Sequence, residues 1–380
     1  MRIGILDYAN NGRRTGVGYY SLGLIRSLAN RFGPKDIVVY TNDPEAVSQI
    51  DARITIRNIP GRKHQFLRLW WQHFCLSRQA EVDGLDVLHC PAYVMPLRPC
   101  RVPCVITVHD IHALTHPKWC SLGNRLHYGM MLPQSIRRAA AVIVVSEDTR
   151  KAVLQQFGSW RNNIHGIPPG IDDIFTDTAD PVAEEDCRRR HNLPVRYILH
   201  VSNIEPRKNI SVAIEAVRLL RKRGVDHSLV LVGQNRRSPV SLRRMLLDAQ
   251  HEGVVRHLGY VAREDLPALY RMADAVLCVA HHEGFGFPPL EAMACGTPVV
   301  SSMAGAMRET LGDAAMAVVP ENVQSVADVL FTVINDMSLR NRMRDKGLCR
   351  VEKFQWERVA DKMHRIYVAA CREQPEIESQ

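Results

Sequence analysis

The chain has 380 residues, 46% of them hydrophobic and 23% charged, with a formal net charge of +9. A chain of this length is too long for one comfortable core, so two domains are expected, and its composition is that of an ordinary soluble globular protein. No apolar run is long enough to predict a transmembrane helix.

The first residues, MRIGILDYANN, predict a strand over 2–7 that enters a polar loop. Asp7 interrupts a short apolar run, which is not the pattern of a signal peptide. The sequence therefore predicts a cytoplasmic protein. Its ten cysteines include no CxxC pair, and several lie in apolar runs, which favours reduced and mostly buried thiols.

The positive charge is concentrated in the first half of the chain. Residues 1–175 contain 21 Lys and Arg against 13 Asp and Glu, whereas the remaining residues contain 28 against 27. A basic first half predicts an anionic partner: a polyphosphate lipid, a membrane surface or a nucleic acid.

A glycine-containing loop follows the first strand, and an amphipathic helix runs from it to about residue 28. The loop lacks the GxGxxG spacing of a dinucleotide site, which argues against a dehydrogenase. Gly16 and Gly18 nevertheless permit close approach of the backbone to a ligand.

Short apolar strands alternate with helical stretches through the first half, a rhythm typical of a parallel sheet covered by helices on both faces. The predicted strands lie at 37–40, 54–56, 87–89, 105–108, 141–145 and 164–167. Between them, in residues 57–78, Arg62, Lys63, Arg68 and Arg78 interleave with Phe66, Trp70, Trp71 and Phe74. This segment predicts either a helix adsorbed to a membrane or a surface helix that packs its aromatic side on the sheet.

His109 and Asp110 follow the predicted strand 105–108 directly, at the edge where open α/β sheets bind ligands. The neighbouring cysteines and histidines match no common zinc spacing, so structural roles are expected for them and no metal ion is predicted. These residues are Cys100, Cys104, His112, His116 and Cys120.

The strand rhythm restarts after a polar run at 173–186, which predicts a linker. Strands are expected at 197–201, 229–232, 254–258, 275–279 and 299–300. The first of them leads into Glu205-Pro206-Arg207-Lys208-Asn209 and a helix over 210–223. Two adjacent cations between a strand and a helix N-terminus suit an anionic ligand, although a solvated basic pair is the alternative.

The stretch from Val279 to Ser301, VAHHEGFGFPPLEAMACGTPVVS, is the most informative part of the sequence. It predicts a strand, a glycine-rich turn and a helix whose unpaired N–H groups suit an anion. Glu283 precedes the glycines and Glu291 is expected in the first turn of the helix. Both are negative, so we expect them to accept hydrogen bonds from hydroxyl groups rather than to bind phosphate.

The pair of glutamates separated by seven residues in EGFGFPPLEAMACGTPVV resembles the signature of retaining glycosyltransferases of family 4. The segments EPRKN, TVHDIHALTHPKW and HLGYVAREDLPALYRMADAVL resemble the same family, and the similarity extends over nearly the whole chain. The resemblance implies the GT-B fold, with two Rossmann-like α/β domains facing across a cleft. It places an acceptor-binding domain at 1–175, a nucleotide-sugar-binding domain at 176–355, a helix crossing back at 356–372 and a tail at 373–380.

The resemblance also implies roles for individual residues. Arg207 and Lys208 would bind the donor diphosphate, Glu283 the sugar hydroxyls and Glu291 the ribose, with His109 and Asp110 on the sugar and acceptor side. Further donor contacts are implied for Gly16, Gly233, Tyr260, Val261, Gly284, Phe285, Gly286, Phe287 and Leu290. The chain has no Asp-x-Asp motif, so the paired cations are expected to replace a metal ion, and no cofactor is expected beyond the donor.

The sequence therefore predicts a retaining, metal-independent hexosyltransferase. Resemblance to bacterial mannosyltransferases favours GDP-mannose as donor and a saccharide or polyprenyl-diphosphate-linked saccharide as acceptor, in synthesis of a surface polysaccharide. UDP-glucose or UDP-N-acetylglucosamine as donor, and a non-catalytic nucleotide-sugar-binding protein, remain alternatives. The basic first domain is compatible with peripheral contact to the inner face of the cell membrane. No nucleic-acid-binding module is recognisable, so nucleic acid is not an expected partner.

Overall fold

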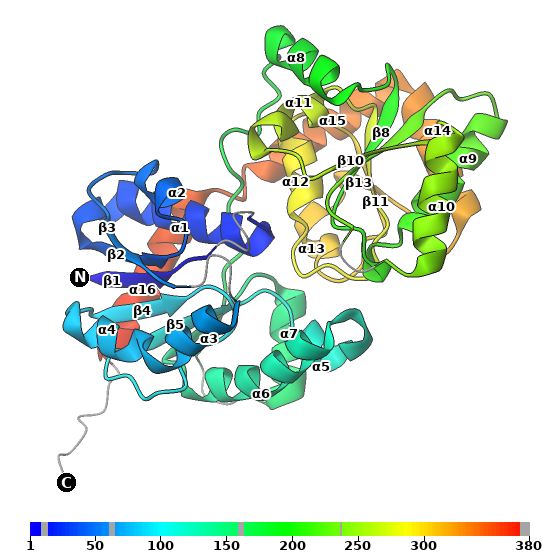
Figure 1. The fold of residues 1–380 in the computed structure, drawn as a ribbon. Coiled ribbons are helices and arrows are strands. Elements are labelled where there is room, and N and C mark those ends of the chain that lie inside the picture. Colours follow the sequence, from blue (N-terminus) through cyan, green and yellow to red (C-terminus); the bar gives the residue numbers. More distant parts are fainter. Residues whose placement is uncertain (9–13, 61–64, 159–162, 236–237, 373–380) are drawn as a thin grey trace. The chain divides into compact units, whose positions relative to one another are not determined.

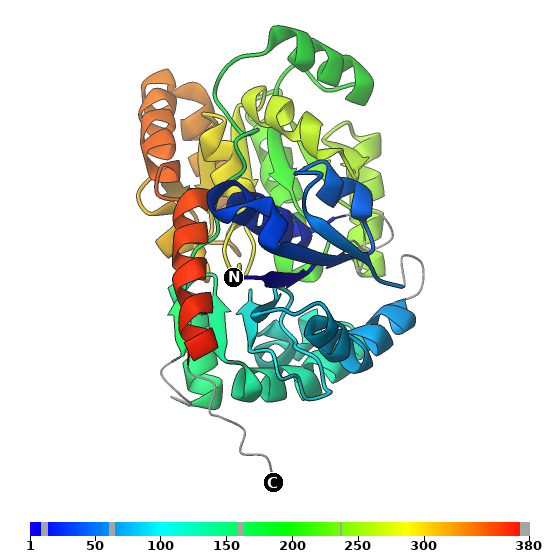
Figure 2. The same cartoon turned by 90° about the vertical axis from the view of Figure 1, so that its left-hand side faces the viewer.

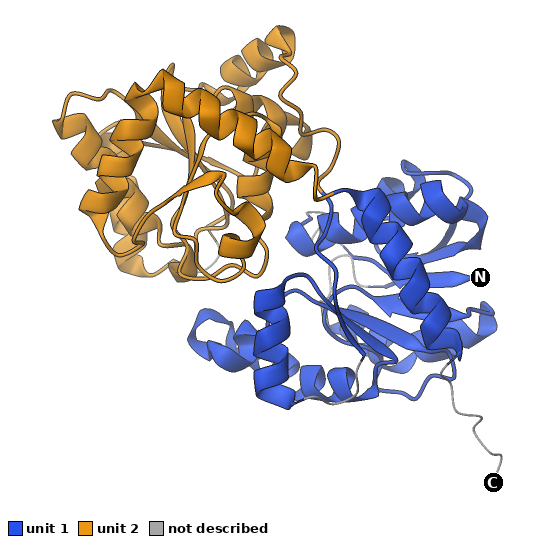
Figure 3. Ribbon diagram, turned by 180° about the vertical axis from the view of Figure 1, so that it is seen from behind, with its two compact units in different colours: residues 1–170, 355–380 blue, residues 171–354 orange. Residues whose placement is uncertain are grey.

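The computed structural model describes residues 1–380 except 9–13, 61–64, 159–162, 236–237 and 373–380 (Figure 1). The chain forms two compact units (Figure 3): unit 1 comprises Met1–Gly170 with Gln355–Gln380, and unit 2 comprises Ile171–Phe354. The tail predicted at 373–380 lies outside the described residues.

Unit 1 is built on a parallel sheet of seven strands in the order β3-β2-β1-β4-β5-β6-β7. Its central strands are buried apolar runs, as expected of a parallel sheet covered on both faces. The register pairs Ile3 with Ile37 on one side and with Val87 on the other. The strands are β1 (Ile3–Leu6), β2 (Ile37–Thr41), β3 (Thr55–Asn58), β4 (Val87–Cys90), β5 (Cys104–Val108), β6 (Ala141–Val144) and β7 (Ile164–Gly166).

The helices of unit 1 connect these strands and pack on the sheet. They are α1 (Gly16–Phe32), α2 (Pro44–Ser48), α3 (Gln65–Phe74), α4 (Leu76–Val82), α5 (His112–Thr115), α6 (Leu122–Arg138), α7 (Glu147–Phe157) and α16 (Trp356–Arg372). Short 3₁₀ helices lie at η1 (Pro34–Asp36) and η2 (Pro117–Trp119).

The last helix, α16, belongs to unit 1 although it follows unit 2 in the sequence. It lies beside α1 (Figure 2) and also contacts β4 and β5. The fully buried Tyr367 of α16 bonds through its hydroxyl to Nδ1 of His89 at 2.7 Å, and Nε2 of His89 contacts Thr107 at 2.8 Å. These contacts attach α16 to the centre of the unit 1 sheet.

Unit 2 contains a second parallel sheet, with six strands in the order β10-β9-β8-β11-β12-β13. Relative to its own first strand this is the order 3-2-1-4-5-6 of a Rossmann fold. The strands are β8 (Tyr197–Val201), β9 (Ser228–Val232), β10 (Val255–Gly259), β11 (Ala275–Cys278), β12 (Val299–Ser301) and β13 (Ala315–Ala317).

The helices of unit 2 cover this sheet around a core of buried aliphatic residues that includes Ile198, Ile214 and Leu231. They are α8 (Pro181–His191), α9 (Ile210–Lys222), α10 (Val240–His251), α11 (Leu266–Arg271), α12 (Phe287–Ala294), α13 (Met307–Leu311), α14 (Val323–Asn335) and α15 (Met337–Val351), with 3₁₀ helices η3 (Pro206–Lys208) and η4 (Arg263–Asp265).

The two parallel-sheet α/β domains confirm the predicted fold class, whereas two local predictions are wrong and one strand was not predicted. The polar run 173–186 is not linker throughout, because Asp180 caps α8, which begins at Pro181. Strand β13 was not predicted, since its three residues, Ala-Met-Ala, carry no strand pattern. Glu291 lies in the second turn of α12, because the helix begins at Phe287, with Pro288 in its first turn.

For the segment 57–78, helix α3 does not match the alternative of a surface helix that packs its aromatic side on the sheet. Phe66, Trp70 and Phe74 are exposed, so α3 does not pack its aromatic side on the sheet as a whole. Trp71 alone of these aromatic residues packs against the core. Arg62 and Lys63 lie outside the described residues. Among the described residues, no helix is both long enough and apolar enough to cross a membrane.

Candidate active site

The strand orders locate one candidate site in each unit. In an open parallel sheet, ligands bind at the carboxyl ends of the strands where the chain order reverses direction. In unit 2 this position lies between β8 and β11, and in unit 1 it lies between β1 and β4.

In unit 2, the loop after β8 and the loop after β11 bring three predicted residues together. Arg207 and Lys208 lie in η3, and Glu283 follows β11. Nη1 of Arg207 donates to Oε2 of Glu283 at 3.0 Å, and Nζ of Lys208 donates to Oε1. One carboxylate thus bridges two cations from the neighbouring loop.

Backbone contacts fix this cluster. The N–H of His281 donates to the carbonyl of Arg207 at 2.9 Å, which joins the two loops directly. Nη1 of Arg207 also donates to the carbonyl oxygen of His282. On the other side, the N–H of Ala306 donates to the carbonyl of Glu283 at 2.9 Å. Hydrogen bonds to both the backbone and the side chain therefore fix Glu283 in place.

The electrostatics keep Glu283 ionised. Burial by itself would raise the pKa of Glu283, but Lys208 and Arg207 outweigh burial and lower the pKa to about 2. Beneath the cluster, Nδ1 of the buried His200 donates to the carbonyl of Leu277 at 2.7 Å. Burial, with the charge of Lys208, lowers the pKa of His200 to about 4, so the imidazole is neutral at physiological pH.

The glycine turn and α12 lie next along the chain. Gly286 adopts φ +99°, a conformation that glycine permits, and forms the N-cap of α12. Phe285 is buried against Phe287 and Phe354, with ring centroids 4.9 and 5.7 Å away. Gly284 precedes this pair. Leu290 is fully buried, so its side chain belongs to the core of unit 2.

Glu291 has a separate set of partners from Glu283. Its carboxylate accepts hydrogen bonds from the hydroxyl of Tyr270 at 2.9 Å and from Nη1 of Arg263 at 3.3 Å. Burial raises the pKa of Glu291, opposed by Arg263 and Tyr270. Arg263 also contacts Asp172 at 3.4 Å. Arg263 and Tyr270 were not predicted, although both lie in the run HLGYVAREDLPALYRMADAVL on which the family resemblance partly rests.

The remaining predicted donor residues of unit 2 lie at the ends of β9 and β10. Gly233 follows β9 with φ +136°, and a Cβ there would lie 2.0 Å from the carbonyl oxygen of Ser202, so only glycine fits. Tyr260 is partly exposed and Val261 is buried. The carbonyl of Gly233 accepts a hydrogen bond from Nε2 of His257 at 2.8 Å.

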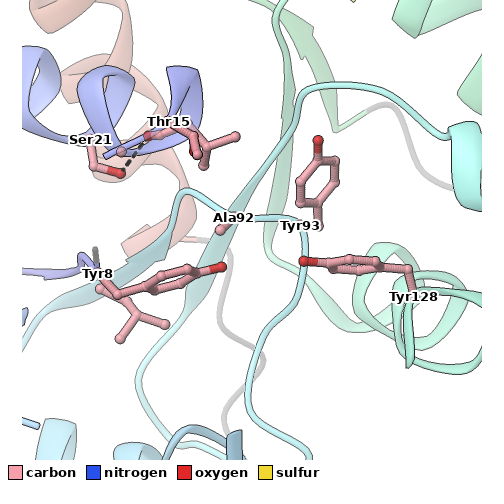
Figure 4. Close-up of a pocket in the computed structure, with 9 residues that line it drawn as sticks. Tyr8, Thr15, Ser21, Ala92, Tyr93 and Tyr128 are labelled. Atoms are coloured by element: carbon pink, nitrogen blue, oxygen red, sulfur yellow. Dashed lines mark hydrogen bonds between the residues drawn. The ribbon is translucent and has the colours of Figure 1, made fainter. Parts of the chain in front are cut away.

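In unit 1, residues at the ends of β1 and β4, at the start of α1 and on α6 line a pocket of about 110 Å³ (Figure 4). It lies at the start of α1, immediately beside the predicted Gly16. Figure 4 shows the hydroxyl groups of Tyr8 and Tyr128 pointing toward each other. The lining residues are Leu6, Tyr8, Thr15, Val17, Gly18, Ser21, Ala92, Tyr93 and Tyr128. Burial raises the pKa of Tyr8, Tyr93 and Tyr128, so these phenols stay protonated and can donate hydrogen bonds.

His109 and Asp110 adjoin this pocket through Tyr93. The Tyr93 hydroxyl donates to Oδ2 of Asp110 at 3.1 Å, and its ring lies edge-on to His109 with centroids 5.5 Å apart. Nε2 of His109 donates to the carbonyl of Pro91 at 2.8 Å, which leaves Nδ1 as an acceptor. Burial lowers the pKa of His109, so the ring is neutral.

The backbone of Tyr93 is strained, because φ is +71° and bulky side chains rarely adopt this region. Its N–H donates to the carbonyl of Thr107 at 2.9 Å, which holds the residue in this conformation. None of the three pocket tyrosines was predicted as a site residue from the sequence. Tyr8 and Tyr93 could have been found from their positions at or just after predicted strand ends, but Tyr128, on α6, carries no such signal.

The structure also locates the cysteines. All ten are free thiols. In the part of the chain that the structure describes, one group of three side chains is close enough to share a metal ion, namely Cys187, His191 and Asp265. Asp265 already binds Arg190 and Nε2 of His191, the latter at 2.8 Å. The histidines and cysteines between 100 and 120 do not form such a group.

Two parallel-sheet α/β domains, each with its candidate site at the point where the strand order reverses, form the architecture of the GT-B fold. Two family models match the chain: Glycosyltransferase Family 4 over residues 14–175 and Glycosyl transferases group 1 over residues 183–348. Together they span most of its length. The chain is therefore a glycosyltransferase that consists of a Family 4 domain followed by a group 1 domain, and it has the GT-B fold.

Two relatives and one solved structure illustrate the similarity. The O-antigen chain mannosyltransferase B of Escherichia coli is 29% identical over 363 residues, covering 90% of this chain and 93% of that protein. A D-inositol 3-phosphate glycosyltransferase of Xylanimonas cellulosilytica is 29% identical, covering 97% of this chain and 95% of that protein. The structure of Anabaena Alr3699/HepE, solved in complex with UDP-glucose, superposes with a TM-score of 0.74 at 19% identity, covering 96% and 99% of the two chains.

Proposed function

We propose that the protein transfers a hexosyl group from a nucleotide-sugar, with GDP-mannose favoured, to a hydroxyl of a saccharide or lipid-linked saccharide in the synthesis of a surface polysaccharide. The observation that carries the proposal is the pair of cations, Arg207 and Lys208, fixed beside Glu283 at the strand ends of unit 2. The relation to an O-antigen mannosyltransferase supports mannose as the transferred sugar.

Breaking a sugar–diphosphate bond leaves negative charge on the departing diphosphate, and fixed cations at that position lower the barrier. Arg207 and Lys208 are well suited to this role. An ammonium group has three N–H donors, and described residues engage one of those of Lys208, through Glu283. The diphosphate would thus share the cations with Glu283 rather than displace it. The backbone N–H groups of residues 284–287 would add further donors, whereas Pro288 and Pro289 in the first turn of α12 carry no N–H.

The two glutamates take different parts. The anionic Glu283 would accept hydrogen bonds from the sugar hydroxyls and stabilise positive charge on the anomeric carbon as the bond breaks. Glu291 would bind the ribose hydroxyls, and its bonds to Tyr270 and Arg263 orient it for that role. Gly233, Tyr260 and Val261 would lie around the base. These assignments account for why one glutamate is tied to cations and the other to a hydroxyl and a guanidinium group.

The pocket of unit 1 would bind the acceptor. Three protonated phenols and the Asp110 carboxylate offer both donors and acceptors to sugar hydroxyls, and aromatic rings suit the apolar face of a pyranose. Asp110 would orient the acceptor hydroxyl, and His109 would contact the sugar through Nδ1. Gly16, at the first position of α1, would approach the donor through its backbone.

We further propose that the reaction retains the anomeric configuration and needs no metal ion. The paired cations supply the charge that a metal would otherwise provide, and the leaving phosphate would accept the proton of the acceptor hydroxyl during attack on the same face. Inverted product, detected by NMR of the new anomeric proton, would contradict retention. Activity abolished by EDTA and restored by a divalent ion would contradict the metal-free reaction.

A lipid-linked acceptor would place the protein at the inner face of the cell membrane, in line with its basic first half. The alternatives are transfer from UDP-glucose or UDP-N-acetylglucosamine and binding of a nucleotide-sugar without transfer. The first alternative is retained because Anabaena Alr3699/HepE was solved in complex with UDP-glucose. At 19% identity, that similarity supports the fold alone.

A melting-temperature screen tests the donor. The intact protein is heated with GDP, UDP and ADP and with their common sugar conjugates, because a ligand that binds the folded state raises the melting temperature. GDP-mannose is expected to give the largest increase and to release GDP slowly when no acceptor is present. A larger increase with a UDP-sugar would reassign the donor, and binding without any hydrolysis or transfer would favour the non-catalytic alternative.

A further inference from the structure

Helix α3 buries polar side chains and exposes apolar ones, the opposite of the usual arrangement. Its buried residues are polar: Arg68, Gln72 and His73. Nε2 of Gln72 donates to the carbonyl of Val94 at 3.1 Å, and Arg68 lies 4.0 Å from the ring centroid of Tyr8. The outward residues are apolar, namely Phe66, Leu67, Trp70 and Phe74, with Phe66 88% and Trp70 58% exposed. In a surface helix of a globular protein the apolar stripe normally faces the core. The exposed apolar side of α3 therefore suits an apolar environment outside the protein.

A second exposed apolar stripe lies on α6. Leu122, Leu126 and Met130 recur at intervals of four residues, which places them along one side of the helix, and all three are exposed, Leu122 by 71%. The rings of His73 on α3 and His127 on α6 lie 5.5 Å apart, so the two helices are neighbours. We call the exposed apolar residues of α3 and of the first half of α6 the α3–α6 surface.

The two segments that carry this surface have charges of one sign. Residues 60–80 and 111–140 contain no Asp or Glu, whereas they include Arg78, Lys118 and Arg125. These three side chains are exposed, as is Arg98, whose N–H donates to the carbonyl of His73 at the end of α3. Arg78, Arg98 and Arg125 form no ion pair with any residue that the structure describes.

From this arrangement we infer that the α3–α6 surface docks on a lipid bilayer that carries anionic headgroups. Aromatic and aliphatic side chains flanked by Lys and Arg suit the interface of such a bilayer, where the rings enter the acyl boundary and the cations meet the headgroups. A second copy of the chain is a poorer occupant, because pairing the same surface would bring two cationic rims together.

The surface adjoins the unit 1 pocket through one side chain. Arg68 projects from the buried side of α3 onto the ring of Tyr8, which lines the pocket. A sugar carried by a membrane lipid would therefore reach the pocket from the helix that contacts the membrane. In this respect the inference deepens and rests on the proposed function, since it explains how a lipid-linked acceptor meets the enzyme.

Vesicle sedimentation of the intact protein tests the inference. The expected result is binding to vesicles of phosphatidylcholine with added phosphatidylglycerol, weak binding to phosphatidylcholine alone, and loss of binding as salt is raised. The double variant Phe66→Ser/Trp70→Ser should bind at least about tenfold more weakly, because it removes two aromatic anchors from the bilayer interface. The double variant Arg98→Gln/Arg125→Gln should lose less of its vesicle binding. In the unaltered protein, brominated lipid should quench the fluorescence of Trp70.

The matched control is Val240→Ser/Leu247→Ser on α10 of unit 2, where Val240 is 73% exposed and Leu247 is also exposed. This variant should bind vesicles like the unaltered protein. Equal binding of the α3 variant, or no binding to anionic vesicles by the unaltered protein, would overturn the inference. So would a dimer, seen by light scattering, that the α3 variant dissociates, because it would assign the surface to a second copy. Two measurements without vesicles test the proposed function separately: the rise in melting temperature with the donor, and transfer to a soluble acceptor. If both are seen but vesicle binding is not, the docking surface is wrong and the proposed function stands.

Discussion

The two units share a strand order but use it for different chemistry. In unit 2, the reversal point holds three charged side chains, Arg207, Lys208 and Glu283, in direct ion pairs. In unit 1, the equivalent position holds a pocket lined by Tyr8, Tyr93 and Tyr128 that are neutral at physiological pH. The difference teaches that the sheet fixes where a ligand binds, whereas the loops after the strands decide which ligand it is.

The two positions also differ in the source of the unfavourable free energy that the protein must offset. Unit 2 buries a carboxylate and compensates it with two cations, so that the pKa of Glu283 falls to about 2 in spite of burial. Unit 1 instead holds Tyr93 at φ +71°, a strained conformation for a bulky residue. A charged ligand suits the first arrangement and a neutral polyhydroxyl ligand suits the second. Four experiments test this contrast.

The largest effect is expected from removing a cation in unit 2. Lys208→Ala should lower kcat by about 10²–10³, since it removes one group that stabilises charge developing on the diphosphate. The measurement is steady-state transfer with the donor found in the melting screen. Lys222→Ala, an exposed lysine at the end of α9, is the control and should leave kcat unchanged. A loss of only a few-fold for Lys208→Ala would remove this residue from the leaving-group role.

The second effect concerns acid stability. The folded pKa of Glu283, about 2, lies below its ordinary value of 4.5, so its ion pairs stabilise the protein fully above pH 4.5 and are lost as the pH falls toward 2. This contribution is roughly 3 kcal/mol at most. In Glu283→Gln, the free energy of unfolding should be lower near neutral pH and should fall less steeply over that window.

Calorimetric melting from pH 7 downward compares Glu283→Gln with the unaltered protein, and the two curves should converge at the acid end. Glu185→Gln, at an exposed position on α8, is the control and should reproduce the unaltered profile. Curves that stay parallel over the whole range would mean that the ion pairs with Arg207 and Lys208 do not persist in solution.

The third effect belongs to unit 1. Tyr93→Phe keeps the ring but removes the hydroxyl that binds Asp110 at 3.1 Å, and it should raise the KM for the acceptor about 5- to 30-fold with kcat little changed. The KM for the donor should stay the same, because Tyr93 is assigned to the acceptor, whereas the residues assigned to the diphosphate, the ribose and the base lie in unit 2. A rise in the donor KM instead would break the division of roles between the two units.

The smallest effect is expected at the nucleotide base. Tyr260→Ala should weaken binding of the free nucleoside diphosphate about fivefold, the loss of one aromatic contact of about 1 kcal/mol. Isothermal titration measures this change. Phe331→Ala removes an aromatic side chain of the same 40% exposure on α14 of unit 2 and should leave the affinity unaltered. An equal loss in both variants would point to a general change in unit 2.

The sequence predicted unit 2 more completely than unit 1, for a physical reason. Arg207 and Lys208 are adjacent, and Glu283 lies beside its own glycine turn, so each motif shows in a short window. The pocket of unit 1 collects Tyr8, Tyr93 and Tyr128 from three separate segments. No short pattern joins them, because parallel strands separated by helices bring distant loops to one edge only after folding.

The sequence by itself determined the two α/β domains, most of their strands and the family, because apolar runs and glycine turns are local signals. It also determined which residues carry charge. Only the tertiary structure decided that Glu283 bridges Arg207 and Lys208 while Glu291 bonds to Tyr270 and Arg263. It likewise decided that α3 turns its aromatic residues outward. Partner choice and burial depend on what packs beside each residue, and the order of residues along the chain does not specify that.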